Sequence, residues 1–154
     1  MRWYVYYDTG FLWPVSPNKN KKEFRVLGSA ASEDLVFNSR TWGTSAHWAF
    51  HSVPYYQATG QAWLYMNVGP EIMIRRGTWY CLELHILKGQ GTGAFEGWVN
   101  DVQKWQYLNI YTGSEPIQSM ELMVTFDGTS PINQYQWVDD FVVSDQKIGC
   151  GTTP

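Results

Sequence analysis

The sequence has few charged residues, and their balance does not favour a nucleic-acid partner. Asp, Glu, Lys and Arg make up 16% of the 154 residues, and the formal net charge is −3. Nucleic-acid binding depends on basic side chains that neutralise phosphates, so we expect no partner of that kind. No apolar run approaches the roughly 20 residues of a membrane-spanning helix, so we also expect no membrane partner.

The chain lacks the features that would fix its compartment. No basic and apolar leader resembling a signal peptide opens the sequence. Cysteine is scarce, with only Cys81 and Cys150 present. They either form a disulfide that ties the tail to the strand around Cys81 or remain two separate thiols, and their spacing does not decide between these alternatives.

Helical periodicity is also missing, whereas alternation of apolar and polar residues is frequent. A period of two is typical of strands with one buried face. The predicted strands are Arg2–Asp8, Glu23–Leu27, 35–37, 47–51, Gln61–Val68, 79–87, 95–100, Lys104–Ile110, Ser119–Phe126 and Gln134–Ser144. Such a series predicts one domain over residues 1–154, an all-β, two-sheet antiparallel sandwich or jelly roll.

Two segments carry more specific expectations. Near its end the last strand has apolar residues on both of its faces, which favours a central position in a sheet. The basic run at residues 18–22 is predicted to be a solvated hairpin tip.

The most informative stretch is Gly77–Asn100, which reads as two strands joined by a glycine-rich loop. In the first strand Tyr80, Leu82, Leu84 and Ile86 form an apolar face, so Glu83 and His85 lie on the open face. Residues on the buried face of one strand must lie opposite residues on the buried face of the other. The simplest register that meets this condition places His85 opposite Glu96, Glu83 opposite Trp98, and Cys81 opposite Asn100. A shift by two residues, which places His85 opposite Trp98, is the alternative.

One open face is expected to gather aromatic, amide and charged side chains from several strands. The candidate ligand-binding residues are Arg2, Tyr4, Trp63, Tyr65, Asn67, Glu83, His85, Glu96, Trp98 and Asn100. Sugar rings stack on indole and phenol, and their hydroxyls bond to amides, carboxylates and guanidinium. This inventory predicts polysaccharide binding, although a face covered by a loop or a second protein would also use these aromatics.

Several segments together carry a resemblance to a known superfamily. They are RWYVYYDTGFLWP, KEFRVLG, GTWYCLELHILK, GAFEGWVND and WVDDFVVSDQKIGC. In order and spacing they resemble the concanavalin A-like lectin and glucanase superfamily, and within it domains similar to alginate- and heparin-type polysaccharide lyases. The resemblance implies a jelly roll and a lectin-like, carbohydrate-binding concave face, and it favours an extracellular or particle-associated protein.

The resemblance also implies an enzymatic alternative, a lyase acting on uronate-containing glycans. Such a lyase needs a base, an acid and a group that neutralises the uronate carboxylate. His85 would be the base, Tyr65 the acid, and Arg25 or Arg2 with Asn67 the neutralising group. A glycosidase would instead use Glu83 and Glu96. The long insertions that often wall a lyase cleft are missing, so we expect a binding module rather than an enzyme.

The remaining expectations concern metals and assembly. We expect no cofactor and no catalytic metal, although Asp127, Asp139 and Asp140 would allow a structural calcium. Domains of this superfamily usually have one or more strands before the segment that corresponds to Arg2–Asp8. The first strand could therefore form an unprotected sheet edge. An assembly domain of a homo-oligomer, filament or virion surface is therefore the third functional hypothesis.

Overall fold

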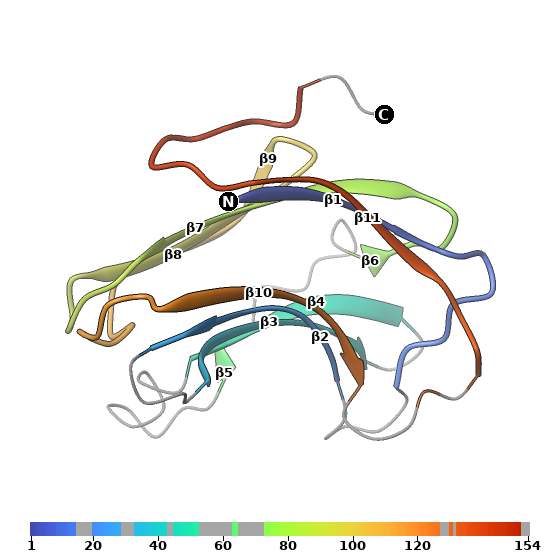
Figure 1. The fold of residues 1–154 in the computed structure, drawn as a ribbon, viewed down its shortest axis with the longest axis horizontal. Coiled ribbons are helices and arrows are strands. Elements are labelled where there is room, and N and C mark those ends of the chain that lie inside the picture. Colours follow the sequence, from blue (N-terminus) through green and yellow to red (C-terminus); the bar gives the residue numbers. More distant parts are fainter. Residues whose placement is uncertain are drawn as a thin grey trace.

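The computed structural model describes residues 1–14, 20–28, 33–42, 45–52, 63–64, 73–126, 130 and 132–151. All the secondary-structure elements in this part of the chain are β-strands, and they form two stacked antiparallel sheets (Figure 1). None of it is a helix with the length and apolarity to span a membrane. The predicted all-β, two-sheet fold is confirmed.

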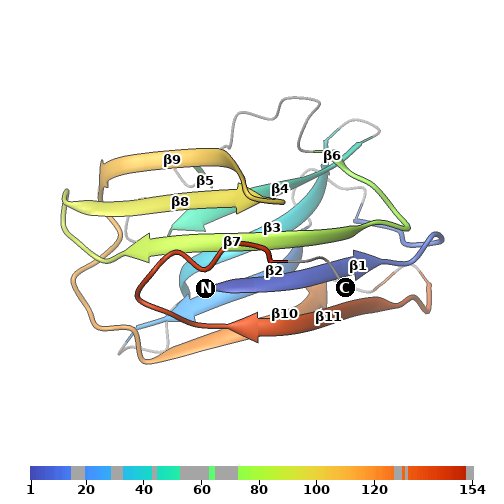
Figure 2. The same ribbon diagram turned by 90° about the horizontal axis from the view of Figure 1, so that it is seen from above.

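The five-stranded sheet has the order β11-β1-β7-β8-β9 (Figure 2). Its strands are Gln136–Val142, Arg2–Tyr7, Trp79–Leu87, Gly93–Val99 and Val102–Ile110. The simplest predicted register of the central hairpin is confirmed, because His85 pairs with Glu96 and Glu83 with Trp98. The turn between β8 and β9 holds Asn100 and Asp101 at φ 50° and 64°, the left-handed pair that a two-residue hairpin turn requires.

The six-stranded sheet has the order β10-β2-β3-β4-β5, with β6 also paired to β4. Its strands, in that order, are Ser119–Phe126, Lys21–Leu27, Glu33–Trp42, Ser45–Ser52 and Trp63–Leu64, with β6 at Met73–Ile74. Of the strand predicted at Gln61–Val68, only β5 lies within the described residues.

Large aromatic side chains fill the space between the sheets. Phe50 and Phe95 stack at a centroid distance of 3.6 Å, and Trp3 packs on Phe24 at 5.6 Å. Trp3, Trp13, Trp48 and Trp105 are all buried. Much of the aromatic excess therefore stabilises the core, where each large apolar side chain contributes about 1.5–3 kcal/mol on burial.

Both sheets bow in the same sense, so the outer face of the six-stranded sheet is hollow and that of the five-stranded sheet bulges (Figure 1). Arg25 on β2 and Trp63 on β5 belong to the hollow sheet, whereas β1, β7 and β8 belong to the bulging one. The prediction that one concave face gathers all candidate residues is therefore wrong. Alternation fixes which side of its own strand a residue occupies, but it does not assign strands to sheets.

Two predictions about sheet edges are also wrong. The first strand, β1, lies between β11 and β7, and the last strand, β11, is an edge. Asp140 has φ 50°, and the β1–β11 register shifts between Arg2 and Tyr4. This irregularity interrupts the alternation of side chains along β11. Apolar residues at both odd and even positions therefore do not indicate a central strand here.

The basic run does not form a fully solvated tip. Residues 15–19 lie outside the described residues, but Lys21 in β2 is fully buried and its ammonium contacts Glu23 at 2.5 Å. The pair lies inside the sandwich, where Tyr7 donates a hydrogen bond of 2.8 Å to Glu23.

Candidate functional site

A pocket of about 260 Å³ opens on the outer face of the five-stranded sheet. One wall comes from β7 and β8, and the other from residues 144–147, which follow β11. Its central side chains are His85, Glu96, Trp98 and Lys147. We call this site the Trp98 pocket.

His85 and Glu96 form a linked pair, with Nδ1 of the imidazole 2.9 Å from Oε2 of the carboxylate. The Glu96 side chain is 17% exposed and that of His85 is 53% exposed. Gln106 and Gln103 donate hydrogen bonds to the other carboxylate oxygen at 2.8 and 3.2 Å. The Gln106 bond is the main cause that lowers the pKa of Glu96; burial opposes it, and His85 and Gln103 add to it.

This pair has a defined chemical capacity. An ionised Glu96 favours the proton on Nδ1 of a neutral His85, and Nε2 is then left as an acceptor. The arrangement suits hydrogen bonding to a ligand hydroxyl, and it also suits a general base.

Trp98 supplies the flat apolar surface of the pocket. Its indole is partly exposed, and Nζ of Lys147 lies 5.1 Å from the ring centroid. The ammonium lies over the ring face in a cation–π contact, which places a positive charge within the pocket.

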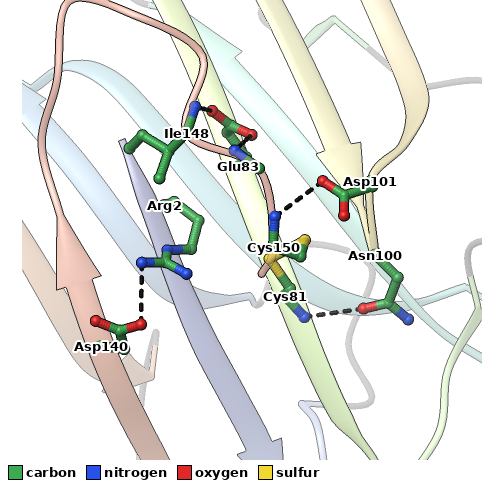
Figure 3. The surroundings of a disulfide bond; sticks show 9 residues. Arg2, Cys81, Glu83, Asn100, Asp101, Asp140, Ile148 and Cys150 are labelled. Carbon is green, nitrogen blue, oxygen red and sulfur yellow. Dashed lines mark hydrogen bonds and ion pairs between the residues drawn. A yellow bond between two sulfur atoms is a disulfide. The ribbon is translucent and has the colours of Figure 1, made fainter. Parts of the chain in front are cut away.

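Glu83, in contrast, serves as an anchor. It is buried, and its two carboxylate oxygens accept hydrogen bonds from the backbone N–H groups of Ile148 and Gly149 at 2.6 and 3.0 Å. These bonds hold residues 143–151, which we call the C-terminal strap, against the outer face of the sheet (Figure 3).

A disulfide between Cys81 and Cys150 fixes the same strap, with the Cα atoms 5.8 Å apart. Asp101 accepts a hydrogen bond from the backbone N–H of Cys150, and Asn100 accepts one from Cys81, both at 2.9 Å (Figure 3). Of the two alternatives for the cysteines, the structure has the bonded one. Asn100 is thus a turn residue whose amide oxygen already has a partner.

Arg2 and Tyr4 lie on the predicted face but are not open to solvent. Tyr4 is 1% exposed and packs with Cys81 and Cys150. The Arg2 guanidinium is 2.9 Å from the carboxylate of Asp140 (Figure 3). A covered face was one of the alternatives considered from the sequence, and the strap covers this part.

Arg25 is not in the pocket, and the side chains of three further candidates lie outside the part of the chain that the structure describes. Arg25 lies on the opposite outer face and pairs with Glu121 at 2.6 Å. The side chain of Trp63, and Tyr65 and Asn67 entirely, lie outside the described residues. His85 and Arg25 cannot surround one substrate atom, because the whole sandwich lies between them.

Sequence reasoning missed Lys147 and the two glutamines. Gln106 pairs with Glu96 in the β8–β9 register, so extending the alternation from β8 to β9 could have found it. Lys147 lies in an irregular segment, and no periodicity predicts where such a segment folds.

Among the described residues no group of three His, Cys, Asp or Glu side chains could hold a metal ion. Asp140 is engaged with Arg2, and Asp127 lies outside the described residues. The structural calcium stays an untested expectation.

The fold is similar to that of a solved polysaccharide lyase. A double mutant of the alginate lyase Aly36B, in complex with an alginate trisaccharide, matches with a TM-score of 0.60 and 14% identity over 90% of this chain. The structure titled alginate lyase Aly36B matches with a TM-score of 0.57 and 15% identity, also over 90% of the chain.

This likeness confirms the jelly-roll resemblance at the level of the fold. The chain spans 66% and 65% of the two lyase chains, slightly less than two thirds of their length. No protein-family model matches the sequence, and no curated protein matches it.

Proposed function

We propose that this protein is a polysaccharide-binding module whose ligand occupies the Trp98 pocket. The observation that carries the proposal is the combination of a partly exposed indole, the linked His85–Glu96 pair and the Lys147 ammonium in one pocket. The indole offers a stacking surface, while the polar groups bond to the hydroxyl rim of a sugar.

The ligand we propose is an acidic polysaccharide, with alginate as the first to test. The Lys147 ammonium, which lies over the Trp98 ring, can move to pair with a uronate carboxylate and so leave the ring face to the sugar. The solved lyase of similar fold binds an alginate trisaccharide, which supports this choice. The disulfide supports an extracellular setting, because such bonds persist in oxidising compartments.

Titration calorimetry with alginate oligosaccharides tests the binding proposal. Trp98→Ala should weaken binding by about 1–3 kcal/mol, if the stacking resembles that of bases on aromatic platforms. Leu87→Ala is the matched control, because Leu87 is exposed and lies on the same face of β7 as His85. Equal affinity of wild type and Trp98→Ala would remove the pocket from consideration.

A second candidate function, a polyuronate lyase, is favoured by the His85–Glu96 pair alone. The Nε2 atom of His85 could remove the C5 proton of a uronate whose carboxylate is neutralised by Lys147. No tyrosine is among the described residues that line the pocket, so an acid for the leaving oxygen is not evident. Binding without catalysis is therefore the better supported function.

Incubation with alginate, followed by ultraviolet absorbance of unsaturated uronates, separates the two functions. A lyase would generate absorbance that His85→Ala abolishes and Leu87→Ala leaves unchanged. A binding module would generate none while still retaining affinity for the polymer.

A further inference from the structure

Four aromatic side chains form a continuous row across the outer face of the five-stranded sheet, away from the Trp98 pocket. Tyr6 on β1 pairs in register with Trp137 on β11 and with Trp79 on β7. The ring centroids are 5.3 Å apart for Tyr6–Trp137 and 5.4 Å for Tyr6–Trp79, and Tyr135 extends the row 5.9 Å beyond Trp137. We call these four residues the aromatic row.

The outer end of the row is open to solvent. Tyr135 is 66% exposed and Trp137 is 45% exposed, whereas Tyr6 and Trp79 are half-buried. The Tyr135 and Trp137 rings are inclined by 31° to one another, so the two exposed rings form a gently angled aromatic surface. The core does not require this exposure, because these four side chains lie on the outer face of the sheet.

The row and the Trp98 pocket are separate sites. Trp79 lies at the start of β7 and His85 near its end, and between them Cys81 is bonded to the strap. The strap therefore crosses the face between the two sites, as seen from above (Figure 2).

The charges near the row favour a neutral partner. Asp139 lies on β11 opposite Tyr4, two residues from Trp137. Arg2 is paired with Asp140, and Arg75 and Arg76, which precede Trp79, line a different cavity beside Trp13. Among the described residues, no ammonium group lies over a ring of the row as that of Lys147 lies over Trp98.

The same acidic residues disfavour a second copy of this chain as the occupant. A symmetric antiparallel pairing of two β11 edges centred on Asp139 would bring the two Asp139 carboxylates together, which is repulsive. The left-handed conformation of Asp140 and the register shift also interrupt the edge.

A hollow of about 340 Å³ adjoins the inner end of the row, and Trp79 and Tyr4 both line it. The hydroxyl of Tyr4 is buried and has no hydrogen-bond partner among the described residues. The polar lining of the hollow comes instead from Asn100 and Asp101, which offer amide and carboxylate groups to a sugar hydroxyl.

We propose that the aromatic row is a second glycan-binding site, one that takes a neutral polysaccharide chain. Sugar faces stack on Tyr135 and Trp137, and the chain runs over Tyr6 and Trp79 towards the hollow beside Tyr4. This site is independent of the acidic-polysaccharide site proposed at Trp98, and either can exist without the other.

Titration calorimetry of the full chain with cellohexaose, xylohexaose and mannohexaose tests the proposal, with an alginate hexamer as the acidic comparison. At least one neutral hexamer should bind, with an affinity that changes little between low and high salt. Trp137→Ala should weaken that binding by about tenfold, as expected for loss of one stacked ring. Tyr135→Ala should also weaken binding of that hexamer. Because Tyr135 is the more exposed of the two, this variant keeps the test valid if Trp137→Ala does not fold.

Two controls assign the effect to the row. Leu87→Ala removes an exposed apolar side chain from the same face of β7, and Trp98→Ala removes the aromatic surface of the other pocket; neither should alter neutral-glycan binding. The proposal is overturned if no neutral hexamer binds, if both row variants bind as wild type does, or if Trp98→Ala abolishes the binding. It is also overturned if light scattering shows a dimer that Trp137→Ala dissociates, because the row would then be a protein interface.

Discussion

At the residue scale, Lys21 and Glu23 form an ion pair in the middle of an aromatic core. Both side chains are essentially inaccessible. Glu23 also accepts hydrogen bonds from Tyr7, Ser39 and Gln136. Burial lowers the pKa of Lys21, with Glu23 opposing the shift, and burial together with Glu23 raises the pKa of Tyr7 well above its ordinary value. Tyr7 therefore remains a hydrogen-bond donor.

Removal of one member of this pair should be far more harmful than neutralisation of both. Lys21→Met leaves a buried carboxylate without its counter-ion, and we expect it to lower the free energy of unfolding by about 3–5 kcal/mol. The double variant Lys21→Met/Glu23→Gln should recover part of that loss, because the amide oxygen still accepts from Tyr7.

Urea unfolding measures both effects. Lys104→Met on β9, where the lysine is partly exposed, is the control and should change stability by about 0.5 kcal/mol or less. If the double variant were less stable than Lys21→Met alone, the carboxylate would be stabilising the core by its hydrogen bonds rather than by its charge.

At the element scale, the C-terminal strap is an irregular segment that takes part in the proposed acidic-glycan site. Its residues 144–147 form one wall of the Trp98 pocket. Glu83, Asp101 and the Cys81–Cys150 disulfide hold the residues that follow. The pocket geometry therefore depends on a covalent bond formed outside the pocket.

Loss of the disulfide should reduce both stability and binding. The bond joins cysteines 69 positions apart, and chain entropy predicts a loss of about 4 kcal/mol in the free energy of unfolding when a loop of this size is opened. The double variant Cys81→Ser/Cys150→Ser should also bind alginate more weakly, because the strap no longer holds the Lys147 ammonium at the pocket.

Thermal unfolding and titration calorimetry check the two effects separately, with the wild type treated by a mild reductant as the matched sample. Unchanged affinity in the serine variant would show that Glu83 and Asp101 suffice to hold the strap. Unchanged stability would show that the strap is not a structural part of the sandwich.

At the scale of the whole molecule, alternation in the sequence predicted the faces of strands well. It identified Tyr80, Leu82 and Leu84 as the buried face of their strand, and parity reduced the hairpin to two registers, of which the simpler one, with His85 opposite Glu96, is the observed one. Both inferences rest on a period of two within one hairpin or one strand, which local sequence contains.

The assignment of strands to sheets could not be obtained in this way. β1 pairs with β7 and β11, which lie far away along the chain. Alternation shows that a residue points outwards, but it does not show from which of the two sheets. Arg25 and His85 were therefore placed together although the core separates them. The burial of Lys21 and the path of the strap also depend on long-range contacts that no local pattern encodes.

The disulfide also determines how the molecule would respond to a mechanical load. A pulling force applied at Gly151 passes through Cys150 to Cys81, which lies within β7, and this strand is hydrogen-bonded on both sides. Without the bond, the same force would peel the edge strand β11 from its end, one hydrogen bond after another. With it, the load enters the sheet at Cys81, inside a strand paired on both sides, so the disulfide protects the weaker edge strand β11.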